Sequence, residues 1–264
     1  MRFTLRLLVL TLVLSCTAIP PQPSYPIPRR PEGGVAEAKH GKVLGSSFDQ
    51  INVAFALSRS LDRYFEAVAE RLGYRRETPL EVWLDPEWAS AATAFDTCIV
   101  VNPRMLQIEE HSGAATDEMC VAVDPRLLQP GQADGIMAHE LTHWHAMFTP
   151  LRNLPQVAYE GLACKVVAEV VPGWDAAQRA ALDPLIDAAR ARGDLPDLLA
   201  RADMDVNSWT TPPFDERLED LYALGFRLVD RIGIDPLIDA AEKGPVTLEE
   251  ILAMAGVGPD GSGL

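Results

Sequence analysis

The sequence has little positive charge. Its 264 residues include 23 Lys and Arg against 38 Asp and Glu, which gives a formal net charge of -15 at pH 7. A surface this acidic repels phosphate backbones, so we expect no nucleic-acid partner. No second long apolar run follows the first fifteen residues, which excludes a multi-span membrane protein. The sequence also lacks a glycine-rich phosphate loop, a nucleophile-elbow serine and a dinucleotide fingerprint.

Cysteine is also scarce, with four in the chain. Cys98 and Cys120 each begin one of two nearly identical segments, in which a short apolar stretch runs into Pro-Arg. Two such strands lying side by side in the same register would have neighbouring first residues. A Cys98–Cys120 disulfide is therefore a hypothesis, and it would stabilise the fold by roughly 3 kcal/mol through lost chain entropy.

The first 15 residues have the composition of a secretory signal peptide. Two arginines precede an apolar stretch, residues 7–14, that is too short to span a bilayer. The residues Val13-Leu14-Ser15-Cys16 resemble a bacterial lipobox. This resemblance implies that Cys16 becomes the lipidated first residue of an envelope lipoprotein that faces the periplasm. An ordinary cleaved signal and a secreted product are the alternative.

Prolines dominate the stretch that follows the signal peptide. Residues 16–41 are predicted to form an extended, proline-rich tether, which lifts a folded body off the membrane. We expect one folded domain over residues 42–256 and a frayed tail over 257–264.

The expected domain is mostly helical. Apolar spacing predicts helices at 51–72, 131–148, 157–171, 174–192, 214–232 and 247–255, and a strand at 80–84. Few strands among many helices indicate an α+β fold with a small β-sheet.

The residues His139-Glu140-Leu141-Thr142-His143 form the HExxH pattern inside one of these helices. Positions i and i+4 lie on the same face of a helix, so both imidazoles can face one metal ion. Glu140 lies about 100° around the helix. From there a general base can reach a metal-activated water without binding the metal. The alternative is a pair of buried core histidines.

Catalytic zinc needs a third protein ligand besides His139 and His143. A histidine six residues after His143 is absent, because Thr149 occupies that position. Prolines then break the helix, and helical spacing resumes at Gln156, which predicts an antiparallel helical hairpin. In this hairpin Glu160 and His143 lie at similar distances from the turn along the two helix axes. Glu169 is about 13 Å further along the helix and is too distant, so Glu160 is the candidate.

This motif, followed by Tyr159-Glu160-Gly161-Leu162-Ala163, resembles the gluzincin zinc metallopeptidases, including bacterial peptidase-MA-like lipoproteins, over about residues 135–164. The resemblance implies a zincin-like domain in which one Zn2+ is bound by His139, His143 and Glu160. It also implies that Glu140 is the general base and proton shuttle.

Two further positions bear on this resemblance. Some gluzincins carry, four residues after the ligand glutamate, an aspartate that orients a ligand histidine. Cys164 stands there, so we expect the orienting contact to come from elsewhere. Cys164 is interpreted as a buried core residue, with metal contact as the alternative.

A later segment, 220–229, is similar to a gluzincin helix of the form Tyr-x-x-Gly-aromatic. By that similarity Tyr222 would donate a hydrogen bond to the developing oxyanion. In the alternative, Tyr222 is a core aromatic and Gly225 allows a close helix contact.

The sequence therefore predicts a zinc-dependent hydrolase of peptide bonds that acts on peptide or protein substrates. It would be attached to the bacterial envelope by its N-terminal lipid alone. One alternative is a non-catalytic, zinc-binding envelope lipoprotein that binds a partner, and another is a zinc hydrolase of cell-wall amides. The sequence gives no prediction of oligomeric state.

Overall fold

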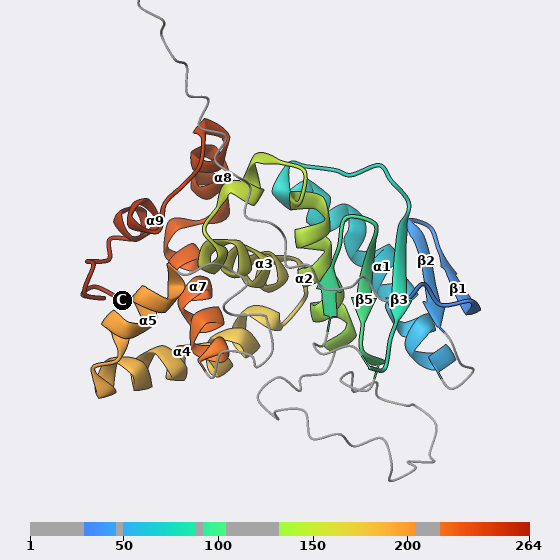
Figure 1. Cartoon of the computed structure of the whole chain (residues 1–264), viewed down its shortest axis with the longest axis horizontal. Coiled ribbons are helices and arrows are strands. Elements are labelled where there is room, and N and C mark those ends of the chain that lie inside the picture. Colours follow the sequence, from blue (N-terminus) through green and yellow to red (C-terminus); the bar gives the residue numbers. More distant parts are fainter. Residues whose placement is uncertain (1–28, 46–49, 88–91, 104–131, 204–216) are drawn as a thin grey trace, which may run out of the picture.

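The computed structural model describes residues 29–45, 50–87, 92–103, 132–203 and 217–264. Over these residues the fold is α+β, with a small sheet on one side and a larger group of helices on the other (Figure 1). Cys16 and Cys120 lie outside the described residues, so the lipid anchor and the Cys98–Cys120 disulfide stay predictions. None of the described helices is long and apolar enough to span a lipid bilayer.

The sheet is mixed and has the strand order β1-β2-β3-β5-β4. The strands are β1 (Gly33–Ala38), β2 (Gly41–Gly45), β3 (Leu80–Leu84), β4 (Ala92–Ala94) and β5 (Cys98–Val101). β2, β3 and β5 run parallel, and β1 and β4 are the antiparallel edges. β3 has the bounds that the sequence predicted.

The folded part of the chain begins at Gly33, earlier than the boundary at residue 42 that we expected. β1 pairs with β2, and Ala36 and Val43 are buried in the main core. The proline-rich tether therefore does not extend to residue 41. The strand was missed because its sequence, GGVAEA, contains only one β-branched residue and directly follows a run of prolines.

Helices form the rest of the described fold. They are α1 (Ile51–Leu72), α2 (Gln132–Ala146), α3 (Gln156–Val170), α4 (Trp174–Arg192), α5 (Leu195–Ala202), α7 (Leu218–Ile232), α8 (Ile234–Lys243) and α9 (Leu248–Met254). The predicted helices are confirmed to within a few residues where they are described. α5 and α8 were missed, because only two residues separate α4 from α5 and a single glycine, Gly233, separates α7 from α8.

The helices pack in layers on the sheet. α1 contacts β1 and β2 and also packs along α2, while α3 packs between α2 and α7 (Figure 1). Leu57 and Leu61 of α1, Leu141 of α2 and Leu162 of α3 are fully buried in one continuous core. Because α2 and α3 lie in the middle of this arrangement, their facing surfaces are held from both sides.

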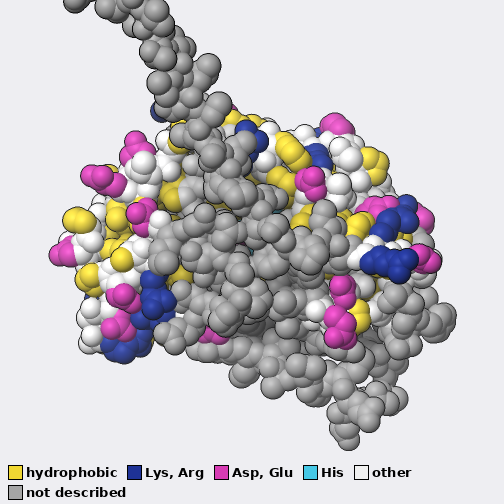
Figure 2. Space-filling model, viewed as in Figure 1, with side chains coloured by type: hydrophobic (Ala, Val, Ile, Leu, Met, Phe, Trp, Pro, Cys, Tyr) yellow, Lys and Arg dark blue, Asp and Glu magenta, His cyan; other side chains and the backbone are white. Residues whose placement is uncertain are grey.

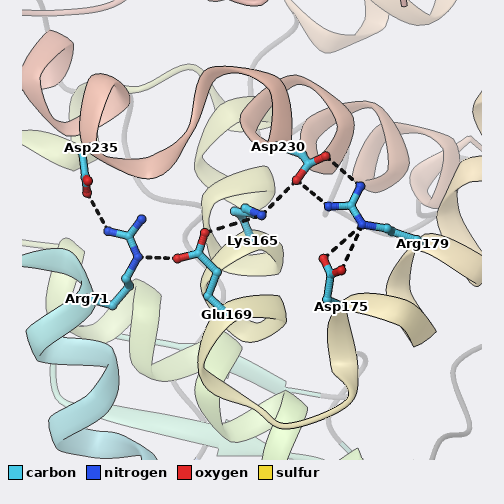
Figure 3. Close-up of polar contacts among 7 residues, drawn as sticks. All are labelled: Arg71, Lys165, Glu169, Asp175, Arg179, Asp230 and Asp235. Carbon is cyan, nitrogen blue, oxygen red and sulfur yellow. Dashed lines mark hydrogen bonds and ion pairs between the residues drawn. The ribbon is translucent and has the colours of Figure 1, made fainter.

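A network of charged side chains joins α3 to four other helices (Figure 3). Lys165 of α3 donates to Asp230 of α7 at 2.9 Å, and Arg179 of α4 donates to the same carboxylate at 2.7 Å. Glu169 of α3 pairs with Arg71 of α1. Asp175 of α4 and Asp235 of α8 complete the network. A single exposed pair contributes little, but several linked pairs fix the orientation of α3.

Charge is unevenly distributed over the described surface. Figure 2 shows Lys and Arg side chains gathered at two places on this face, near α4 and α5 and near β1 and β2. Acidic partners accompany them, such as Asp194 beside Arg192 and Glu81 beside Lys42. Arg192 and Lys42 therefore each have a carboxylate beside them.

The C-terminal residues 257–264, which we expected to fray, are packed on the core. Val257 and Leu264 are buried, and the N–H of Gly258 donates to the carbonyl oxygen of Ser262 at 2.8 Å. Gly261 has a φ of 80°, which lets the chain fold back at low steric cost. The expectation of a frayed tail was therefore wrong.

The backbones of α3 and α7 touch at two glycines. A Cβ atom on Gly161 would lie 2.1 Å from the carbonyl oxygen of Gly225, and a Cβ on Gly225 would lie 2.2 Å from the carbonyl oxygen of Val157. Backbone atoms cannot move aside as a side chain can. Glycine at both positions is thus a condition for this helix contact.

We predict that Gly161→Ala lowers the free energy of unfolding by roughly 1–3 kcal/mol, because the added methyl forces α3 and α7 apart. Urea denaturation measures this difference. Ala180→Ser, which adds one atom at an exposed position of α4, should stay within about 0.5 kcal/mol of wild type. Equal stability of Gly161→Ala and wild type would contradict the close contact.

Candidate metal centre

A short 3-10 turn, η4 (Pro150–Asn153), turns the chain between α2 and α3. Thr149 caps this turn by accepting a hydrogen bond from the N–H of Leu151, and Leu151 is fully buried. Helical spacing puts His139 and His143 on one face of α2, and the turn brings Glu160 of α3 against that face. The predicted hairpin is confirmed in this respect.

Three ligand atoms converge at this place. His139 Nε2 lies 3.0 Å from His143 Nε2, and Glu160 Oε2 lies 3.2 Å from the first nitrogen and 3.3 Å from the second. Ligand atoms about 2.0–2.1 Å from a tetrahedral ion stand about 3.3–3.4 Å apart. The observed triangle fits that spacing within a few tenths of an ångström. These three residues could hold a metal ion.

The electrostatics of the group favour a cation. Burial by itself raises the pKa of Glu160, but the charges and hydrogen bonds of His143 and His139 outweigh it and hold the pKa well below its usual range. Burial lowers the pKa of His143, whereas the charge and hydrogen bond of Glu160 raise it further than burial lowers it. Glu160 is therefore ionised inside the protein and needs a positive charge beside it, from a proton or from a metal ion.

Two residues without a role in the sequence-based prediction, Gln156 and Tyr159, contact the candidate ligands. Gln156 Nε2 donates to Glu160 Oε1 at 2.6 Å. The Tyr159 ring lies against the His143 imidazole with centroids 4.6 Å apart and the ring planes tilted by 34°, and its hydroxyl donates to the carbonyl oxygen of His143 at 3.3 Å. The spacing of four residues between Gln156 and Glu160 was a signal that could have identified the first of them.

Cys164 lies near the His139 imidazole. Burial lowers the pKa of His139, whereas Cys164 and Glu160 raise it further than burial lowers it. The expectation that the orienting contact comes from elsewhere stays a prediction. Cys164 is 6% exposed and packs with Ala168 and Phe226, which agrees with its interpretation as a buried core residue. A small core side chain thus lies beside a candidate ligand.

Glu140 lies beside the three ligands and is not one of them. Glu140 is 7% exposed, and its Oε2 atom is buried without a hydrogen-bond partner in the described part of the chain. Burial raises its pKa, which is offset only in part by His139, by His143 and by a contact with the backbone of Ala94 in β4. The edge strand therefore borders the site, which the sequence analysis did not foresee.

Tyr222 reaches the site from α7. Its ring centroid is 6.2 Å from that of His139, and the ring lies near Glu160. Burial, and then the charge of Glu160, raise its pKa well above the ordinary value, so the hydroxyl keeps its proton at neutral pH. Gly225, three residues later, makes the close helix contact that was the alternative interpretation.

His145, although close in sequence, faces another way. It packs edge-on against Phe65 at 4.7 Å, and its Nδ1 accepts from the N–H of Arg76 at 3.2 Å. Burial lowers its pKa to about 4. It is a neutral core histidine and lies apart from the three candidate ligands.

No family model matches this chain, and no curated protein matches its sequence. The resemblance to gluzincins therefore stays a prediction that depends on residues 135–164 and Tyr222.

We predict that Glu160→Gln lowers metal affinity by more than about 100-fold, since loss of a ligand costs more than loss of an outer hydrogen bond. The variant keeps the shape of the side chain and removes its charge. Metal content after gel filtration and competition with a chelator measure the change.

Glu169→Gln is the matched control, because Glu169 lies nine residues further along α3 and pairs with Arg71 and Lys165. It should bind metal as wild type does. An unchanged affinity in Glu160→Gln would remove Glu160 from the ligand set.

Proposed function

We propose that the chain is a zinc-dependent hydrolase of peptide bonds, with His139, His143 and Glu160 as zinc ligands. Two imidazoles and one carboxylate are a donor set that suits zinc. Structural zinc sites have four protein ligands, whereas catalytic sites have three and keep one position open. The described residues offer three ligands here, which supports a catalytic site.

The observation that carries the proposal is the state of Glu140. A buried carboxylate oxygen without a hydrogen bond costs about 1–3 kcal/mol or more. A site that held zinc only to bind a partner would have no use for such a group beside its ligands. Within the described part of the chain Glu140 Oε2 has no hydrogen-bond partner, which favours catalysis over the non-catalytic alternative.

The chemistry that bound zinc supplies is Lewis acidity toward a carbonyl oxygen and toward water. Glu140 Oε2 accepts a proton from the attacking water and later passes it to the leaving nitrogen. Burial raises the pKa of this carboxyl group above its ordinary value. A general base works best when its pKa lies near the working pH.

Tyr222 supplies a hydrogen-bond donor on the α7 side of the site. Its hydroxyl keeps its proton and lies beside Glu160. As the carbonyl carbon is attacked, its oxygen gains negative charge, and the phenol donates to it in a site with little water. Tyr222 thus stabilises the substrate's carbonyl oxygen, while Glu140 transfers the proton of the attacking water.

The substrate and the location are part of the same proposal. The gluzincin resemblance favours a peptide bond over another amide, with a cell-wall amide as the second candidate substrate. The predicted signal peptide and the lipobox-like residues favour the bacterial envelope, with Cys16 as the lipid-bearing residue.

We predict that Glu140→Gln keeps one zinc ion per chain and lowers kcat by about 10²–10⁴-fold, because the amide has no basic oxygen for the proton. A fluorogenic peptide library measures turnover, and metal analysis measures zinc. Glu249→Gln, at an exposed position of α9, is the control that should leave both unchanged.

Wild-type turnover retained in Glu140→Gln would reject Glu140 as the base. A wild-type protein that binds zinc and hydrolyses neither the peptides nor cell-wall amides would favour the non-catalytic lipoprotein.

A further inference from the structure

The two carboxylate oxygens of Glu160 have different partners. Oε2 faces both histidines, at 3.2 Å from His139 Nε2 and 3.3 Å from His143 Nε2. Oε1 accepts a hydrogen bond from Gln156 Nε2 at 2.6 Å. A free carboxylate can bind a metal ion through one oxygen or through both. In this structure Oε2 is directed to the two imidazoles, and Oε1 is directed to the Gln156 amide.

The helix itself sets this arrangement. Gln156 is the first residue of α3 and lies four residues before Glu160, so the two side chains are neighbours on one helix face. Pro155 precedes it in an extended conformation and starts the helix at that point. The pair therefore does not depend on the conformation of a loop.

The chemistry of the glutamine side chain suits this position. Its amide donates a hydrogen bond without adding charge. A lysine or arginine here would bring a second positive charge to Glu160 and compete with a metal ion, and a carboxylate would repel Glu160. Glu160 is 7% exposed, so little water can replace the amide.

We infer that Gln156 is a positioning residue that limits Glu160 to coordination through Oε2 alone and so keeps a metal position open. This inference depends on the proposed zinc site. Without the Gln156 amide, Oε1 has lost its hydrogen-bond donor. The bound metal ion is then the group that attracts this oxygen. Glu160 turns to bind through both oxygens and fills the position that substrate and water need.

The test is zinc X-ray absorption on the full-length protein with zinc bound. We compare wild type with Gln156→Met, which keeps the length of the side chain and removes the donor. Gln178→Met is the matched control, because Gln178 is a part-buried glutamine of α4 for which the structure records no bond to Glu160. Competition with a chelator measures zinc affinity in parallel.

We expect the first-shell coordination number to rise from four to five in Gln156→Met alone, with a longer mean Zn–O distance. Zinc affinity should fall by roughly 10-fold, as is typical when an outer hydrogen bond is lost. If a peptide is turned over, kcat should fall more than KM changes, because the open position serves the chemical step. A role of Gln156 in helix stability alone would leave the absorption spectrum unchanged.

A spectrum and an affinity equal to those of wild type in folded Gln156→Met would overturn the inference and leave the zinc site standing. Gln156→Ala replaces the methionine variant if that variant does not fold, and the same outcomes apply. A wild-type protein that binds no zinc would overturn both the proposed function and this inference.

Discussion

Two imidazoles and one carboxylate meet within 3.3 Å of one another between α2 and α3, and the rest of the site depends on this convergence. Glu160 is ionised and 7% exposed, so it is stable only with positive charge beside it. The two helices are held on both sides. α1 packs along α2, and α7 touches the backbone of α3. The charged network of α3 adds a polar restraint.

The glycine contact also explains how α7 reaches the group formed by His139, His143 and Glu160. Gly161 lies against Gly225, and the residues near them in sequence are Glu160 and Tyr222. The close approach of the backbones therefore brings the phenol to the carboxylate. Packing and chemistry are linked at this point, because any residue larger than glycine would separate the two side chains.

Local geometry made His139, His143 and Glu160 predictable. Residues four apart share a helix face, and a short turn sets the heights in a hairpin. The contacts of Glu140 with β4 and of Tyr222 with Glu160 depend on tertiary packing, and spacing alone does not contain them. Likewise the first strand was missed, since a short, glycine-rich edge strand carries almost no periodic signal.

The most direct test of the account is a crystal structure of the zinc-loaded protein with anomalous scattering recorded at the zinc edge. We predict one strong peak, about 2.0–2.2 Å from His139 Nε2, His143 Nε2 and Glu160 Oε2. A zinc peak elsewhere, or an α2–α3 interface without one, would contradict the claim that these three side chains form a metal centre.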